Sequence, residues 1–146
     1  MAIGPDVQVW ATAISTNAST GRKVIFRYAR VLSPALDRAS QQIRVIIAWR
    51  YDSENGQPER EEHQRMIAFE DRLGPVLEQG SFATLTLVST GEGLREWIYY
   101  AQSEDGFAAR FNYAFSEAST FPIEIHAAFD PEWTSYHEFK SNVRNG

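Results

Sequence analysis

Three histidines, His63, His126 and His137, are the best metal ligands in a chain that contains no cysteine. None of them stands in the i, i+4 spacing or the HExxH pattern that helical zinc sites use. His126 and His137 flank Asp130, which leaves a shared site open. We favour the simpler interpretation of one histidine on a sheet face and one in solvent. The sequence therefore predicts no metal and no cofactor.

Paired acids are the next candidates for chemistry, and Glu70 and Asp71 are neighbours on a predicted helix. Adjacent helical residues point in different directions, so these two carboxylates do not form an acid–base pair. We expect Glu70 to form a structural ion pair with Arg95 or Arg110. No pattern combines a nucleophile, a base and an orienting residue. The sequence identifies no catalytic residue, and it favours a protein that is not an enzyme.

Two glycine-containing loops resemble ligand-binding motifs but fail in detail. Residues 52–62 align Gly56 and Glu62 with a calcium loop, but Tyr51 stands where the first aspartate is required. Gly91-Glu92-Gly93 would have to open a helix to cradle a phosphate, whereas here it joins two predicted strands. We expect a solvated turn and a tight hairpin.

The aromatic segment 95–101 (REWIYYA) is more informative. Aromatic side chains on an open sheet face stack on bases in RNA-recognition domains, but the RNP1 pattern is absent here. The 14 Lys and Arg residues against 19 Asp and Glu also argue against nucleic acid. An uncovered aromatic face favours a protein partner. The expected binding residues are Arg44, Arg95, Trp97, Tyr99 and His126.

Hydrophobic periodicity indicates the elements that must position these residues. Alternation of apolar and polar residues predicts strands at 7–13, 23–31, 43–49, 82–89, 95–101 and 122–129. Apolar spacings of three and four predict a helix over 58–78, begun by Pro58 and with Pro75 kinking or shortening its last turn. Its expected apolar stripe is Met66, Phe69, Leu73 and Val76.

Two more helices complete the predicted set. One carries its apolar face at Phe107, Phe111, Ala114, Phe115 and Ala118. The other begins at Asp130-Pro131-Glu132, with Asp130 as its N-cap and Pro131 at its first position. Trp133, Tyr136 and Phe139 would anchor it.

The order of elements predicts an α+β fold in one domain, because 146 residues suit a single core. From Ile43 the order is βαββαβ, which is the ferredoxin-like antiparallel sheet with both helices on one face. Residues 42–129 would form this core, 1–41 an added N-terminal hairpin with its connection, and 130–146 a short C-terminal helix and tail. The first two strands either extend the sheet or lie across its open face.

Three segments together resemble the bacterial domain of unknown function 695 family: residues 46–78, the strand pair 87–101 and the ending 123–139 with its Asp-x-x-Trp-x-x-Tyr pattern. The resemblance covers roughly residues 5–140. Some relatives are joined to a domain similar to ribonuclease E inhibitor B proteins, which are ferredoxin-like and bind another protein. The resemblance implies a small intracellular module with a regulatory role, and it transfers no catalytic residue. Asp130, Trp133 and Tyr136 are expected to cap and pack the last helix.

These observations favour a non-catalytic protein-binding or regulatory module. The alternative is a small-ligand or enzymatic pocket between the N-terminal hairpin and the open sheet face, and a homodimer through that face fits either. The first residues lack the features of a signal peptide, and no apolar run approaches the ~18 residues of a membrane span. We expect a cytoplasmic protein that does not enter a membrane.

Overall fold

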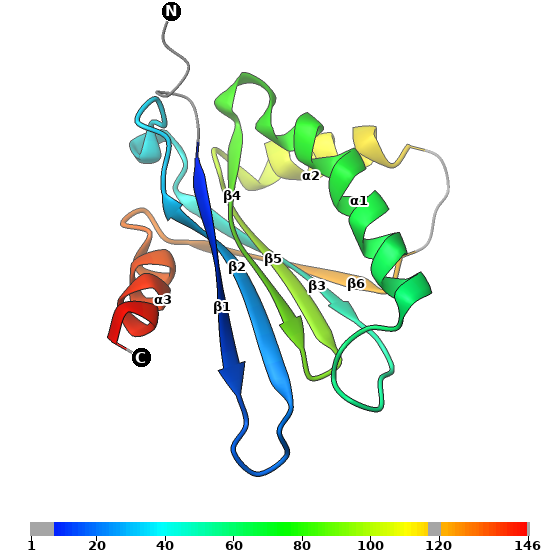
Figure 1. The fold of residues 1–146 in the computed structure, drawn as a ribbon. Helices are drawn as coiled ribbons and strands as arrows, with labels where there is room; N and C mark the ends of the chain where they lie inside the picture. The colour runs from blue at the N-terminus through cyan, green and yellow to red at the C-terminus, as the bar shows by residue number, and fades with distance from the viewer. Residues whose placement is uncertain (1–7, 117–120, 146) are drawn as a thin grey trace, which may run out of the picture.

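The computed structural model describes residues 8–116 and 121–145. One antiparallel sheet of six strands runs through it in the order β1-β2-β4-β5-β3-β6 (Figure 1). The strands are β1 (Val9–Thr16), β2 (Lys23–Val31), β3 (Ile43–Arg50), β4 (Ala83–Gly91), β5 (Leu94–Ala101) and β6 (Ile123–Phe129). The predicted α+β class is confirmed. The first two strands extend the sheet beyond β4, which answers the question that the sequence leaves open.

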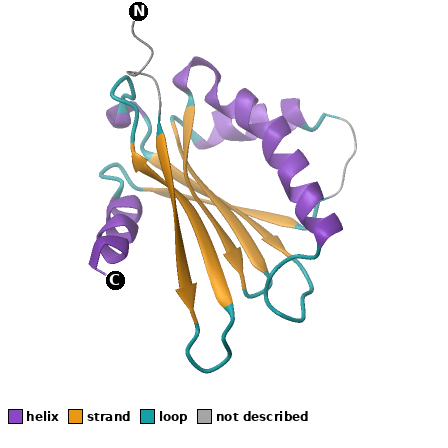
Figure 2. Ribbon diagram, in the orientation of Figure 1, coloured by secondary structure: helices purple, strands orange, loops and turns teal. Residues whose placement is uncertain are grey.

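Three α-helices lie on the two faces of the sheet: α1 (Arg60–Glu78), α2 (Glu104–Ala114) and α3 (Thr134–Asn145). Helices α1 and α2 lie on one face, and α3 lies on the opposite face (Figure 2). Short 3-10 turns occur at η2 (Arg38–Ser40) and η3 (Gln79–Ser81). No helix among the described residues is long and apolar enough to cross a membrane.

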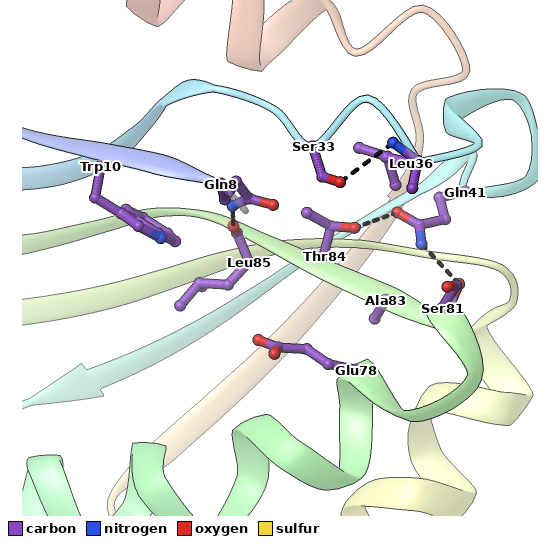
Figure 3. A pocket seen from close by; sticks show the side chains of 11 residues that line it. Gln8, Trp10, Ser33, Leu36, Gln41, Glu78, Ser81, Ala83, Thr84 and Leu85 are labelled. Atoms are coloured by element: carbon purple, nitrogen blue, oxygen red, sulfur yellow. Dashed lines mark hydrogen bonds between the residues drawn. The ribbon is translucent and has the colours of Figure 1, made fainter. Parts of the chain in front are cut away.

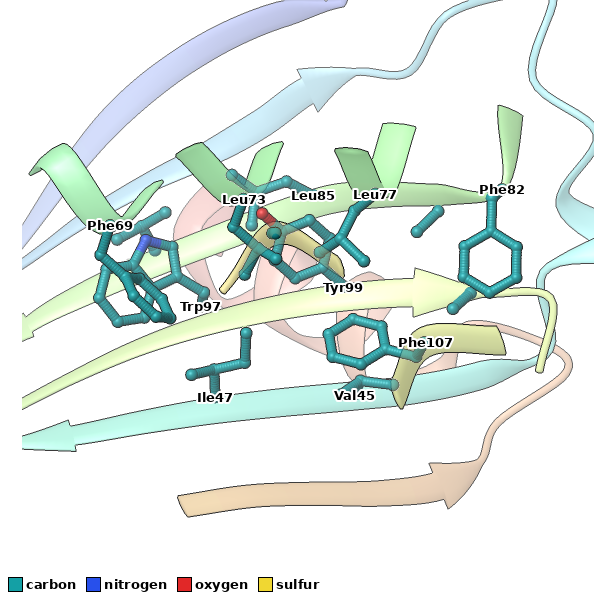
Figure 4. Packing of buried hydrophobic residues seen from close by; sticks show 14 of the residues in the cluster. Val45, Ile47, Phe69, Leu73, Leu77, Phe82, Leu85, Trp97, Tyr99 and Phe107 are labelled. Atoms are coloured by element: carbon teal, nitrogen blue, oxygen red, sulfur yellow. The ribbon is translucent and has the colours of Figure 1, made fainter. Parts of the chain in front are cut away.

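The main core lies between the sheet and the two helices α1 and α2 (Figure 4). The neighbouring strands β3 and β5 contribute Ile47 and Trp97 to this core, and both side chains are almost fully buried. Helix α1 buries Met66, Phe69, Leu73 and Leu77, so three members of the expected stripe are confirmed. The fourth fully buried member is Leu77, whereas the predicted Val76 is only partly buried against the same core. A spacing of four follows the 3.6-residue turn more closely at this point.

Helix α1 begins at Arg60, two residues later than predicted, with Glu59 as its N-cap. Pro75 lies within the last turn, and the helix continues to Glu78, where it was expected to end. Burial of Leu77 beyond the proline stabilises this last turn.

Turn chemistry explains the hairpin between β4 and β5. Glu92 and Gly93 have φ angles of 55° and 75°, both in the left-handed region. A two-residue loop with positive φ at both positions is the type I′ turn that suits the twist of a hairpin. The predicted tight hairpin is confirmed.

The other two helices differ in detail from the sequence prediction. Helix α2 is capped by the Ser103 hydroxyl, which accepts a hydrogen bond from the Gly106 amide at 3.0 Å, and Ala118 lies outside the described residues. Helix α3 begins at Thr134, so the prediction that Pro131 is its first residue is wrong. A turn precedes it instead, in which the Trp133 amide donates to the Asp130 carbonyl at 3.0 Å.

Candidate functional site

The sheet divides the five predicted binding residues into two groups. Arg95, Trp97 and Tyr99 point toward α1 and α2, where all three are buried. Arg44 and His126 lie on the opposite face, because residues opposite each other in the β3–β5 and β3–β6 ladders share a face. The expectation that Trp97 and Tyr99 form an open aromatic face is therefore wrong. The helices cover that side of β5 and make it the core.

The opposite face is partly covered by α3. The Trp133 ring stacks on the Tyr100 ring with centroids 4.2 Å apart, and the Tyr136 hydroxyl donates to the Ala29 carbonyl at 2.5 Å. Arg44 donates to the Ser135 hydroxyl, whereas His126 is exposed and lies 3.3 Å from Glu124. These contacts hold α3 against the sheet. Arg44 and His126 have different partners and do not form a common site.

Asp130 holds the start of α3. Its carboxylate accepts hydrogen bonds from the amides of Thr134 and Ser135 at 2.9 and 3.2 Å, and from the Tyr100 hydroxyl at 2.6 Å. Burial raises the pKa of the Tyr100 hydroxyl, and its bond to Asp130 raises it further. These contacts match the capping role expected of Asp130.

A polar network is built around Glu70 on the other face. Its carboxylate accepts from Trp97 Nε1 at 2.8 Å and from Arg27 Nη2 at 2.6 Å, and Arg95 Nη2 lies 3.4 Å away. Arg95 also donates to the Thr90 hydroxyl at 3.1 Å. The predicted pairing of Glu70 with Arg95 is confirmed.

Arg110, the alternative partner for Glu70, is used elsewhere. It donates to the carbonyls of Val76 and Gln79 at 2.9 and 2.7 Å, at the end of α1. A cation at the C-terminus of a helix satisfies free carbonyls and complements the helix dipole.

The charges of this network depend on one another. Burial alone would raise the pKa of the Glu70 carboxyl, but hydrogen bonds from Arg27 and Trp97 and the nearby guanidinium charges outweigh it, so that the pKa is lowered. Burial lowers the pKa of Arg95, and the charge of Glu70 opposes that shift. Arg95 remains a cation, because an arginine does not deprotonate in proteins. Its Nε has no hydrogen-bond partner among the described residues.

Helix α1 leaves the hairpin β1–β2 uncovered on its own side of the sheet. A cavity of about 400 Å³ lies there, with Glu70, Arg95, His63 and Ile67 in its walls, and Thr12, Ile25 and Arg27 contributed by the hairpin. The guanidinium of Arg27 lies 5.4 Å from the centre of the Trp10 ring. Trp10 in turn lines a second cavity of about 350 Å³. We call these two cavities with the exposed residues Trp10, Ile14, Ile25 and Ile67 the hairpin groove.

The second cavity is lined mainly by polar groups (Figure 3). Gln8 donates to the Leu85 carbonyl at 3.1 Å, and the buried Gln41 bonds to Thr84 and to the Ser81 carbonyl at 2.7 and 2.8 Å. Glu78 extends toward this space, and burial followed by the charge of Glu70 raises its pKa.

No metal-binding group occurs in the part of the chain that the structure describes. Within residues 8–116 and 121–145, no three His, Asp or Glu side chains are grouped to hold a metal ion.

Sequence reasoning missed the groove residues Trp10, Ile14, Ile25 and Ile67. The available signal was the pattern of β1, in which Trp10 and Ile14 share a side with Thr12 while two alanines occupy the other side. Large apolar residues on one side of a strand indicate burial or binding. Only the pairing of β2 with β4 shows that this side lies beyond the cover of α1.

Comparison with known proteins places the chain in a family. No curated protein matched the sequence. A family model described as "Family of unknown function (DUF695)" matches residues 8–140, which is most of the chain. The protein therefore belongs to the DUF695 family, as the sequence resemblance indicates.

Proposed function

We propose that the protein is a non-catalytic, regulatory protein-binding module, and that its hairpin groove receives an apolar segment of a protein partner. One observation carries this proposal. Trp10, Ile14, Ile25 and Ile67 are 38, 57, 37 and 42 % exposed. Ile14 lies opposite Ile25 in the β1–β2 ladder, Ile25 and Ile67 line the same cavity as Arg27, and Arg27 contacts the Trp10 ring. Isolated exposed apolar residues are common, but a group of large ones beside cavities is typical of interaction sites.

The charges of the groove support a specific partner. Arg27 is the accessible cation at its centre, since its side chain is 44 % exposed, whereas Arg95 is only 8 % exposed. Arg27 also contacts Trp10, and tryptophan and arginine are enriched among the residues that dominate binding energy. An apolar segment with a carbonyl or carboxylate at Arg27 would match this surface.

We also propose that the core has the ferredoxin-like arrangement. The elements β3-α1-β4-β5-α2-β6 occur in the required order along the chain, and their strands lie side by side as β4-β5-β3-β6. The added strands β1 and β2 give this core a helix-side surface that four strands would not have. The groove is thus a consequence of the N-terminal extension.

A peptide display library tests the binding proposal. Random peptides selected on the full chain are expected to be rich in apolar residues, and the affinity of a selected peptide is measured by calorimetry. Trp10→Ala and Arg27→Glu should each weaken it at least about tenfold, equivalent to about 1.4 kcal/mol. Arg30→Glu is the matched control, because Arg30 is also exposed on β2 and the charge change is the same. Equal losses in Arg30→Glu and Arg27→Glu, or no selected peptides, would refute the proposal.

A small carboxylate is the second candidate ligand, at the cavity of about 400 Å³. The observation that favours it is the buried Nε of Arg95, which lacks a partner among the described residues. At least one member of a panel of mono- and dicarboxylates should then raise the melting temperature of the wild type. The same compound should leave the melting temperature of Arg27→Gln unchanged. If peptides are selected and no carboxylate changes the melting temperature, protein binding is the function and carboxylate binding is not.

A further inference from the structure

The strand β6 forms the second edge of the sheet, at the opposite end from the hairpin groove. It pairs with β3 on one side and with no described strand on the other. Six of its seven residues, Glu124 to Phe129, are exposed. Alternate residues of such an edge direct unpaired N–H and C=O groups outward, where they can pair with another strand.

This edge has little of the usual protection against pairing, since Glu124 is its one acidic side chain. Proteins protect exposed edge strands with lysine, proline, bulges or inward-pointing charges. The sequence of β6, IEIHAAF, contains no lysine, arginine or proline, and its pairing with β3 has no register shift. Its helix-facing side chains are Ile123, Ile125, Ala127 and Phe129, of which Phe129 is 70 % exposed.

We infer that β6 pairs with β6 of a second copy of the chain, antiparallel and about a two-fold axis at His126. This register sets Ile123 opposite Phe129 of the second copy, and Ile125 opposite Ala127 of the second copy. Each pair occurs twice, so both large exposed residues gain an apolar neighbour and the larger isoleucine faces the smaller alanine. The whole of β6 is used.

The surroundings of β6 favour a second copy over an unrelated strand. An apolar cavity of about 350 Å³ lies between β6 and α2, with Phe107, Phe111, Ile125 and Ala127 among its lining residues. The second copy would bring an equally apolar set of side chains to this side. On the other side, the same register sets Glu124 opposite the small Ala128 of the second copy, so that the two Glu124 carboxylates do not face each other. The surface is complementary to itself.

Sedimentation velocity of the full chain tests this inference. The expected species has twice the 16.6 kDa mass of one chain. Ile125→Lys should yield a folded monomer that still unfolds cooperatively on heating, because this residue is 42 % exposed in one copy and lysine protects edge strands. Ile67→Lys is the matched control at 42 % exposure on α1, and it should remain dimeric. Phe129→Lys replaces Ile125→Lys in the test if the latter unfolds.

Cross-linking tests the register, since the chain has no native cysteine. Under oxidation, His126→Cys should form a disulfide between copies, because opposite Cα atoms lie about 4.5–5.5 Å apart. Ala128→Cys should not, since its counterpart would be more than about 13 Å away. A monomeric wild type, or a dimer broken by Ile67→Lys and retained in Ile125→Lys, would overturn the inference. Cross-linking through Ala128→Cys alone would overturn the register.

Discussion

Replacement of Glu70 by alanine should destabilise the protein strongly, although Glu70 lies at the surface end of its network. The variant leaves Arg95, whose side chain is 8 % exposed, without its counter-ion at 3.4 Å. It also removes the acceptor of Trp97 Nε1 at 2.8 Å. The lost contact with Arg27 adds little, because that side chain is 44 % exposed and solvent screens the pair.

The magnitude follows from the buried partner. Breaking a buried ion pair from one side costs about 3–5 kcal/mol, most of it from the charge left unpaired. Glu70 is 19 % exposed, so water can reach part of the vacated space, and we expect the lower end, about 3 kcal/mol. At about 3 °C per kcal/mol for a chain of this length, the melting temperature should fall by about 9 °C.

Urea unfolding of four proteins provides the assay: the wild type, Glu70→Ala, Asp71→Ala and the double variant Glu70→Ala/Arg95→Met. Asp71 is the exposed neighbour of Glu70 and should change the free energy of unfolding by less than about 0.5 kcal/mol. The double variant should recover at least about 1 kcal/mol relative to Glu70→Ala, because the unpaired charge is gone. A loss below about 1 kcal/mol in Glu70→Ala, or additive effects in the double variant, would refute the reasoning.

Three further predictions concern pH, packing and backbone. The pKa of Glu70 is lowered in the folded state, so the stabilisation by its charge is present above the ordinary value of 4.5 and is lost as pH falls below it. On acid titration, the free energy of unfolding should therefore fall less in Glu70→Gln than in the wild type. The same fall with pH in both proteins would contradict this. In urea unfolding, Leu77→Ala should lower the free energy of unfolding by about 2–5 kcal/mol and Val76→Ala by clearly less, since Leu77 is fully buried. Equal decreases would show that Val76 is as important to the core as Leu77. Gly91→Ala should lower the melting temperature measured by calorimetry, because the alanine Cβ would lie 2.7 Å from the Lys23 carbonyl oxygen. An unchanged melting temperature would contradict this close contact.

The sequence was sufficient for features that depend on local spacing. The spacing of Met66, Phe69 and Leu73 identifies the buried side of α1, and Glu92-Gly93 identifies the hairpin turn. It was insufficient for the faces of β5, because Trp97 and Tyr99 on one side are matched by apolar residues on the other. Such a strand is buried on both sides, and periodicity does not show which side the helices cover.

The candidate site depended on contacts that are distant in sequence. Glu70 and Arg95 were predicted to pair from their residue types, but Arg27 joins them only because β2 pairs with β4. The exposure of Trp10 likewise depends on β1 and β2 extending the sheet. Strand order is set by packing between remote segments, so no local pattern identifies this surface.

Site-specific photo-cross-linking in the native cell tests most directly whether the hairpin groove binds a protein. A photoreactive phenylalanine analogue at Ile14, which is 57 % exposed in the groove, should cross-link to a protein. The same analogue at Tyr113, 77 % exposed on α2, should not give that product. Addition of Arg27→Glu should remove the Ile14 product. Cross-links that are equal at both positions, or that persist with Arg27→Glu, would contradict a binding function for the groove.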